Sequence, residues 1–328
     1  KLLWATYNSS VAPKENEFIS NVSFNESLCR ISFDLEFGAY RGGNAVIAAV
    51  DASGTVLWSW HIWGTDYDPE ETYLDYNNTI WMDRSLGALN SARDKSRTEG
   101  WLYQWGRKDP FPPIDWFALY DGDGNLLPDV DLSDFGVGDK QVAKMPVGSA
   151  QSNLEYSIAH PLTFIYNDDA SESNTATHCI HWISSVQESD AMAMTLWSAV
   201  SKTAWDPCPA GWTVASTNFY SNDPPKHNSL TYTTNAISSF SSDNPQERGA
   251  YINVLDNKTV WVPFQGYRRC TKGGITTNCG DVGVFWTSNN QDACRTWAMK
   301  FRAADLRTMV TYPRSNGLCI RCVKIAEQ

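Results

Sequence analysis

The sequence is 328 residues long, with 42% hydrophobic and 19% charged residues and a formal net charge of −11. This balance is typical of a globular protein of one or two domains and excludes a chain that is disordered throughout. The acidic excess argues against a nucleic-acid-binding protein, because no strongly basic domain is present.

Residues 1–65 are predicted to form strands joined by turns. Cys29–Phe37 alternates apolar and polar residues, which is the period of a half-buried strand. Asn44–Val50 is a candidate buried strand, Asp51–Gly54 is a turn, and Thr55–Trp63 returns as a second strand. The last three segments therefore predict a β-hairpin.

The middle of the chain is predicted to be richer in loops. Residues 66–80 form a polar connection, Thr79–Asp83 a short strand, and 91–109 a mixed stretch with a helix start. Residues 110–195 contain prolines and Asn/Asp/Ser clusters that favour loops, whereas Ala191–Lys202 has helical propensity. Further strands are predicted at 251–255, 259–264, 283–288, 295–302 and 318–325. The expected fold class is α+β, with many strands and little helix.

The cysteine content indicates the compartment. An even count of eight in a chain rich in Trp, Asn and turn residues favours an oxidising environment, so we expect an extracellular or cell-surface protein. The sequence shows no run of apolar residues long enough to span a bilayer and no signal-peptide pattern. Because it begins abruptly at Lys1, an export signal or anchor is expected upstream. The spacing leaves open the pairing of Cys29, Cys179, Cys270, Cys279, Cys294 and Cys319.

Residues 266–328 combine regular motifs with chemically varied residues between them. The motifs are Gly266–Arg268, Phe285–Ser288, Met299–Phe301, Arg314, Gly317 and Ile320–Lys324. The residues between them follow no amphipathic period, which predicts a rigid scaffold that presents a contact surface. This segment has ten basic and four acidic side chains, whereas residues 1–265 have 16 and 33. Its positive charge favours a partner with acidic groups.

Several strings of residues carry a resemblance to a known family. They are Asn44–Ala48, Leu57–Trp63, Trp81–Ala88, Tyr103–Pro112 and Lys202–Trp212. Together they resemble Bacteroidetes surface proteins of the Fibrobacter succinogenes major paralogous domain family, over roughly residues 44–328. That family is similar in fold to C-type lectins and to formylglycine-generating enzymes. The resemblance implies a β-rich N-terminal segment, 1–65, the end of a fimbrillin-like or sandwich domain, and a C-type-lectin-like domain, 66–328.

The tail motifs are also similar to the variable region of proteins diversified by retroelements. The resemblance implies that the residues between the motifs contact a ligand. The residues expected to do so are Arg269, Cys270, Lys272, Phe285, Asn289, Asn290, Trp297, Lys300, Arg302, Asp305, Arg307 and Tyr312. It also implies that Cys208 and Cys322, which lie within the motifs, are close enough to form a disulfide; such a bond would be worth ~4–5 kcal/mol.

The period of the strand at 295–302 adds a structural expectation. It places Trp297, Met299 and Phe301 on one face, which we expect in the core. Ala298, Lys300 and Arg302 fall on the opposite face, which we expect to be displayed.

Three motifs allow other chemistry. Cys319-x-x-Cys322 is the spacing of a redox pair, but the strand predicted at 318–325 does not supply the helix N-terminus that activates a thiol. Asp121–Asn125 is similar to a calcium loop, although Leu126 and Leu132 occupy the sixth and twelfth positions. His178–His181 offers zinc donors without a standard spacing. No metal or other cofactor is therefore predicted, with calcium left open.

The resulting hypothesis is a non-enzymatic ligand-binding adhesin at the cell surface, at the tip of a pilus. Its expected partner is a protein or glycan on another cell that carries acidic groups. Pilus subunits are expected as further partners, and nucleic acid is not expected to bind. Two alternatives stay open: an oxidase similar to formylglycine-generating enzymes, and a structural pilus subunit.

Overall fold

The computed structural model describes residues 1–6, 19–35, 42–76, 79–92, 97–113, 119–120, 123, 125, 142–144, 150–166, 181–183, 195–198, 201–217, 232–233, 248–254, 258–270, 276–292, 294–302 and 306–325. Of the residues that the structure describes, strand accounts for 49% and helix for 5%. Within the described ranges the one α-helix is α1 (Ala150–Ala159). The expected α+β class is therefore wrong, and the fold is β-rich.

The helix was expected in the wrong place. Of Ala191–Lys202, the described residues are 195–198 and 201–202, which contain a 3₁₀ turn at Thr195 and bends instead of an α-helix. Leu196 and Trp197 are both buried there, and the Trp197 indole N–H donates to the Trp205 carbonyl at 2.9 Å. Tertiary packing thus overrides local propensity. Helix α1 lies instead within the stretch predicted as loop.

The strands follow one another in the order β1 (Leu2–Thr6), β2 (Ile19–Asn25), β3 (Arg30–Leu35), β4 (Gly42–Val50), β5 (Val56–Thr65), β6 (Tyr73–Tyr76), β7 (Thr79–Met82), β8 (Leu102–Gln104), β9 (Leu119–Tyr120), β10 (Val142–Lys144), β11 (Phe164–Tyr166), β12 (Trp212–Val214), β13 (Tyr232–Thr233), β14 (Gly249–Val254), β15 (Lys258–Pro263), β16 (Tyr267–Arg268), β17 (Thr276–Thr277), β18 (Val282–Asn290), β19 (Arg295–Arg302), β20 (Leu306–Pro313), β21 (Gly317–Cys319) and β22 (Cys322–Lys324).

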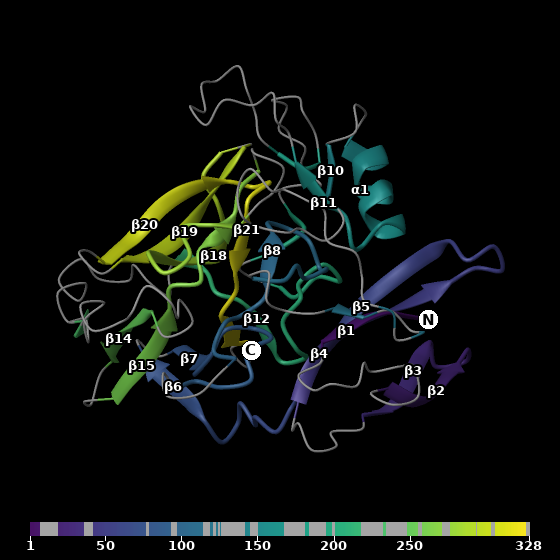
Figure 1. The fold of residues 1–328 in the computed structure, drawn as a ribbon, viewed down its shortest axis with the longest axis horizontal. Coiled ribbons are helices and arrows are strands. Elements are labelled where there is room, and N and C mark those ends of the chain that lie inside the picture. Colours follow the sequence, from purple (N-terminus) through teal and green to yellow (C-terminus); the bar gives the residue numbers. More distant parts are fainter. Residues whose placement is uncertain are drawn as a thin grey trace.

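The N-terminal sheet has the strand order β5-β4-β1-β9, and the β2–β3 hairpin lies beside it (Figure 1). The predicted β4–β5 hairpin is confirmed, with Asn44 opposite Trp63 and Ala48 opposite Ser59. Its turn is closed by Asp51, whose Oδ1 accepts hydrogen bonds from the backbone N–H groups of Ser53 and Thr55 at 2.8 and 2.9 Å. The sequence pattern therefore located both the strands and the turn.

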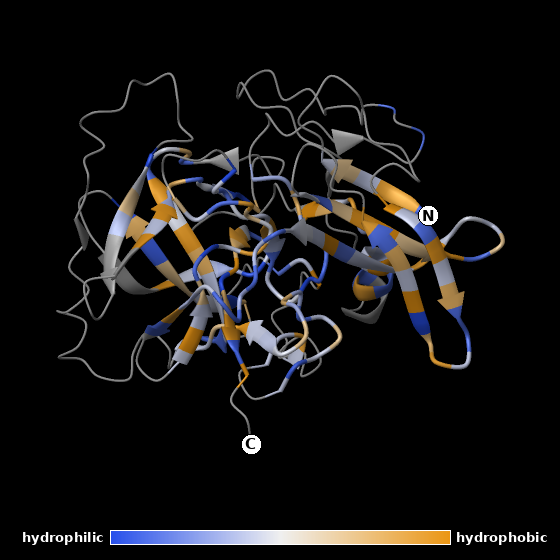
Figure 2. Ribbon diagram, turned by 90° about the horizontal axis from the view of Figure 1, so that it is seen from below, coloured by the Kyte–Doolittle hydropathy of each residue, from blue (hydrophilic) through white to orange (hydrophobic). Residues whose placement is uncertain are grey.

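The C-terminal sheet has seven strands, in the order β17-β16-β21-β18-β19-β20, with β8 also paired to β21. It lies at the opposite end of the molecule from the N-terminal sheet (Figure 1). Apolar residues are concentrated in the strands at both ends, and polar residues are frequent in the connections between them (Figure 2). Strands predicted at 283–288 and 295–302 are confirmed as β18 and β19.

A shared hydrophobic core joins the N-terminal strands to the rest of the chain. Trp4 of β1 stacks on Trp101, with ring centroids 4.5 Å apart, and both belong to one cluster with Val46 and Trp286. The core is thus continuous across residue 65, where the sequence was divided into two parts.

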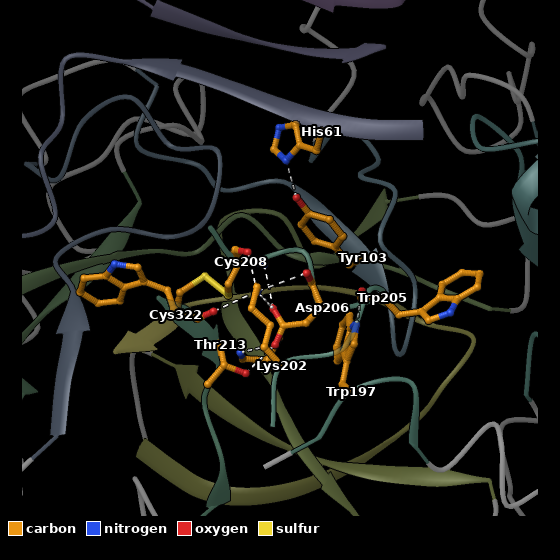
Figure 3. Close-up of a disulfide and its surroundings, with 11 residues drawn as sticks. His61, Tyr103, Trp197, Lys202, Trp205, Asp206, Cys208, Thr213 and Cys322 are labelled. Carbon is orange, nitrogen blue, oxygen red and sulfur yellow. Dashed lines mark hydrogen bonds and ion pairs between the residues drawn. A yellow bond between two sulfur atoms is a disulfide. The ribbon is translucent and has the colours of Figure 1, made fainter. Parts of the chain in front are cut away.

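The disulfide between Cys208 and Cys322 is confirmed, with an S–S distance of 2.02 Å. Figure 3 shows the polar network beside it, in which the Lys202 ammonium lies 2.9 Å from Asp206 Oδ1. The same ammonium donates to the Cys208 carbonyl at 2.6 Å, and Asp206 Oδ1 accepts from the Cys208 N–H at 2.9 Å. This ion pair therefore holds the turn that carries Cys208.

Candidate functional site

The C-terminal sheet is covered on both faces, which corrects the expectation of one displayed face. Met299 and Phe301 point into one core, as expected. Ala298, on the opposite face, is fully buried in a second core beside Val284 and Trp286. Large apolar side chains of β18 thus fill the face that was expected to be open, and only the rim of the sheet reaches the surface.

Two buried arginines of the tail motifs pack against aromatic rings of the core. Arg314 is 0% exposed, and its guanidinium lies 4.7 Å from the centroid of Trp105. Arg321, 2% exposed, lies 5.4 Å from the rings of both Trp81 and Phe285. A desolvated cation on an aromatic face is held firmly, because moving it would leave a buried charge without compensation. These contacts keep the backbone around the rim in place.

Four of the predicted residues are exposed or half-buried along this rim: Arg269, Lys300, Arg302 and Tyr312, here called the basic rim. Arg269 follows β16, Lys300 and Arg302 end β19, and Tyr312 lies near the end of β20. Cross-strand pairing places Lys300 opposite Val284 and Arg302 opposite Val282. The fold therefore brings together side chains from three separate segments.

Tyr312 lies opposite Thr296, at the other end of β19 from Arg302. Its ring packs edge-on against Tyr267, with centroids 5.3 Å apart. Burial raises the pKa of Tyr312 and the neighbouring Tyr267 raises it further, while the positive charges of Arg302 and Arg269 act in the opposite direction. Both guanidinium groups are thus near enough to the phenol to influence its charge. A neutral phenol in the electrostatic field of two arginines can donate hydrogen bonds to an anionic group.

Two predicted contact residues belong to the core instead. Phe285 is 2% exposed and packs edge-on against Phe301 at 5.6 Å. Cys270 is 3% exposed, and its N–H donates to Asn316 Oδ1 at 2.8 Å. Neither side chain can meet a ligand at the surface. Trp297, also predicted, is half-buried on the face that carries Met299.

Asn289 and Asn290 are half-buried at the other end of β18 from the residues opposite Lys300 and Arg302. The Asn289 side-chain oxygen accepts from the Thr217 N–H at 2.6 Å. That of Asn290 accepts from the Arg314 guanidinium at 2.7 Å. Both amides thus hold neighbouring segments in position. Asn290 lies opposite Thr296, which lies opposite Tyr312, so the two amides are at the Tyr312 end of β19 and away from Lys300 and Arg302.

Three predicted contact residues cannot be placed fully. Lys272 and Asp305 lie outside the described residues. Arg307 is described as part of β20, where its backbone lies opposite Lys300.

The structure describes the cysteine motif but only parts of the two motifs that offer metal ligands. Cys322 is bonded to Cys208, whereas Cys319 is a free, fully buried thiol whose pKa is raised by burial. Cys294 is also in a disulfide. A buried thiol with a raised pKa is a poor nucleophile, which argues against Cys319-x-x-Cys322 as a reactive pair. The calcium-like loop and the histidine motif lie mostly outside the described residues.

Sequence reasoning missed Tyr267 as part of this site. It was read only as a scaffold residue of the Gly266–Arg268 motif, yet its ring supports Tyr312 directly. An aromatic residue next to two arginines, Arg268 and Arg269, was an available signal, since aromatic and Arg side chains are frequent in interfaces.

Comparison of the chain with known protein families, curated proteins and solved structures finds no match in any of the three. None of the described residues forms a helix of the length and apolarity needed to cross a membrane.

Proposed function

We propose that this chain is a surface-displayed adhesin that binds acidic groups of a protein or glycan ligand through its basic rim. The observation that carries the proposal is that the charges of Arg269 and Arg302, from two separate segments, both act on the Tyr312 phenol of a third. Arg and Tyr are typical anchors of interfaces, because each combines contact area with directional hydrogen bonds. The rim is basic although the chain as a whole carries a net charge of −11.

The support beneath the rim favours binding. The buried guanidinium of Arg314 and the ring of Tyr267 hold the surrounding backbone and the Tyr312 ring before any ligand arrives. A preorganised site loses less conformational entropy when it binds. The basic side chains would steer an acidic ligand towards it, and this attraction weakens with salt.

A glycan and protein array probed with the full chain tests the proposal. We expect acidic glycans or acidic proteins among the bound species, with binding that weakens as salt is raised from about 0.05 M to about 0.5 M. The double variant Arg269→Ala/Arg302→Ala should lose at least about tenfold in affinity for them, since each charged hydrogen bond is worth about 1.5–3 kcal/mol.

The matched control is Arg30→Ala, which removes an exposed arginine from the β2–β3 hairpin, far from the basic rim. This variant should bind the same array members as the unmodified chain. Equal loss in both variants would point to a general charge effect. Binding that is insensitive to salt and to the double substitution would refute the basic rim as the binding surface.

A further inference from the structure

A groove runs along the outer edge of β5, on strands other than those of the basic rim. Its volume is about 580 Å³, within the range of sites that bind ligands. Six consecutive β5 residues, 58–63, line it. The remaining lining residues are Phe33, Leu35, Leu86, Lys108, Ala204, Asp206, Pro207, Cys208 and Pro209. This cavity is here called the β5 groove.

Strand β5 is the last strand of its sheet and pairs only with β4 among the described strands. An unpaired edge presents backbone N–H and C=O groups to its surroundings, and proteins commonly protect such an edge with charged residues or proline. The β5 sequence Val56–Thr65 has neither a charged residue nor a proline. Its edge is long and apolar and carries neither of these protections in its own sequence, while helix α1 packs against part of the strand.

The two faces of β5 differ in the side chains that they offer to the groove. Trp60 and Ile62 lie on the face of the β2–β3 hairpin, where Phe33 and Leu35 complete an apolar wall. Ser59 and His61 lie on the opposite face, where Lys108 adds a polar wall. A strand laid along this edge would direct its side chains alternately to the two walls.

The backbone on the far side of the groove is poorly suited to pair with a further strand. It is formed by the 204–209 turn, in which Pro207 and Pro209 have no backbone N–H to donate. One end is narrowed by the Trp58 ring, which packs edge-on against Trp205 at 5.3 Å. A single strand would therefore pair with β5 alone.

The polar wall carries no uncompensated charge. The Lys108 ammonium is bonded to Ser59 and lies 2.7 Å from Asp109 Oδ1. His61 is fixed by Asn44, whose Oδ1 lies 2.9 Å from Nε2, and by the Tyr103 hydroxyl, 2.7 Å from Nδ1. Figure 3 shows His61 facing Tyr103. Burial lowers the pKa of His61 to about 3, so the ring is neutral. The groove therefore suits a neutral ligand.

We propose that the β5 groove binds one extended peptide segment of another protein, which adds to the N-terminal sheet as a new strand beside β5. Recognition would come from backbone hydrogen bonds to the β5 edge, a known mode of peptide binding. The six lining residues span about 20 Å, enough for six or seven residues of the partner. The partner segment would be uncharged, with apolar side chains towards Phe33 and Leu35 and small polar ones towards Ser59 and His61.

Fluorescence anisotropy with the full chain tests this. The probes are labelled octapeptides that alternate threonine with one of valine, isoleucine, leucine or phenylalanine. At least one should bind, and the same peptide N-methylated at alternate amides should bind at least about tenfold more weakly, because it cannot form the strand ladder.

Two variants locate the site. Trp60→Lys places a charge in the groove and should weaken binding at least about tenfold, since a bound peptide would have to bury that charge without a partner. Leu57→Lys is the matched control: Leu57 is also on β5 and is 56% exposed, but does not line the groove. It should bind as the unmodified chain does, and circular dichroism should show both variants folded.

Three outcomes would overturn the proposal. One is that none of the octapeptides binds at concentrations up to about 1 mM. Another is that the N-methylated peptide binds as well as its parent, which would show adsorption to the tryptophan rings. The third is that a neutral hexasaccharide displaces the peptide equally from the unmodified chain and from Trp60→Lys.

Discussion

Replacement of Glu99 by Gln should change how the stability of this protein depends on pH. Glu99 is 3% exposed, and neither carboxyl oxygen has a hydrogen-bond partner among the described residues. Burial raises the pKa of Glu99 from 4.5 to about 7, and backbone N–H groups and Arg97 offset only part of that effect. The nearby Cys319 thiol stays protonated, because burial raises its own pKa.

The magnitude follows from proton linkage. Because the pKa is higher in the folded state, that state holds the proton more tightly than the unfolded chain does. Folding stability is then greatest below about pH 4.5 and falls as the pH rises to about 7, where the loss levels off. A difference of about 2.5 pKa units corresponds to about 3 kcal/mol. Glutamine has nearly the same shape and does not titrate, so this dependence should vanish in the variant.

Urea unfolding of both proteins at several pH values between about 4.5 and 8.5 measures the effect. The cost of burying the glutamine amide is the same at every pH. The way in which the difference in free energy of unfolding between the two proteins changes with pH therefore reports on Glu99 alone. That difference should move by up to about 3 kcal/mol in favour of the variant as the pH rises. A difference that stays constant across the range would refute this reasoning.

Two further predictions concern the covalent and backbone constraints. Cys208→Ala/Cys322→Ala opens a loop with a sequence separation of 114 and should lower the free energy of unfolding by about 5 kcal/mol, whereas Cys29→Ser, at an exposed free thiol, should change it little; equal urea midpoints would contradict this. Gly54 and Gly87 both have φ of +86°, so alanine at either position should cost about 1–2 kcal/mol of backbone strain. A Cβ at Gly87 would also lie 2.2 Å from Trp101 Cδ1, while one at Gly54 meets nothing within 4 Å, so Gly87→Ala should reduce the melting temperature clearly more.

Local sequence patterns were sufficient for strands such as β4, β5, β18 and β19, but not for β1, β2 or β20. The β4–β5 hairpin was predictable because Asp51 and Gly54 supply the side-chain acceptor and the positive φ that its turn requires. Helix α1 was not, since the sequence AQSNLEYSIA has no acidic residue in its first turn and no basic residue in its last. Its packing against other segments, invisible in a local window, decides its conformation.

The candidate site was predictable only in part. The motifs indicated that Arg269, Arg302 and Tyr312 lie between scaffold segments, but not that they come together. The alternation of side chains along β19 also could not show that Ala298 is buried in a second core, because that core includes Val284 and Trp286 of another strand. The β5 groove combines residues some 150 positions apart, such as Trp58 and Pro207. Local sequence patterns cannot predict contacts between residues so distant in the sequence.

The double burial of the C-terminal sheet has a consequence for how this protein can evolve. Interior positions such as Met299 and Trp286 would lose several kcal/mol on truncation, whereas surface positions such as Arg302 typically change stability by less than about 0.5 kcal/mol. Substitutions could therefore accumulate at the surface positions of the basic rim while the fold is kept. New binding preferences would be accessible by single substitutions, without first passing through an unfolded intermediate.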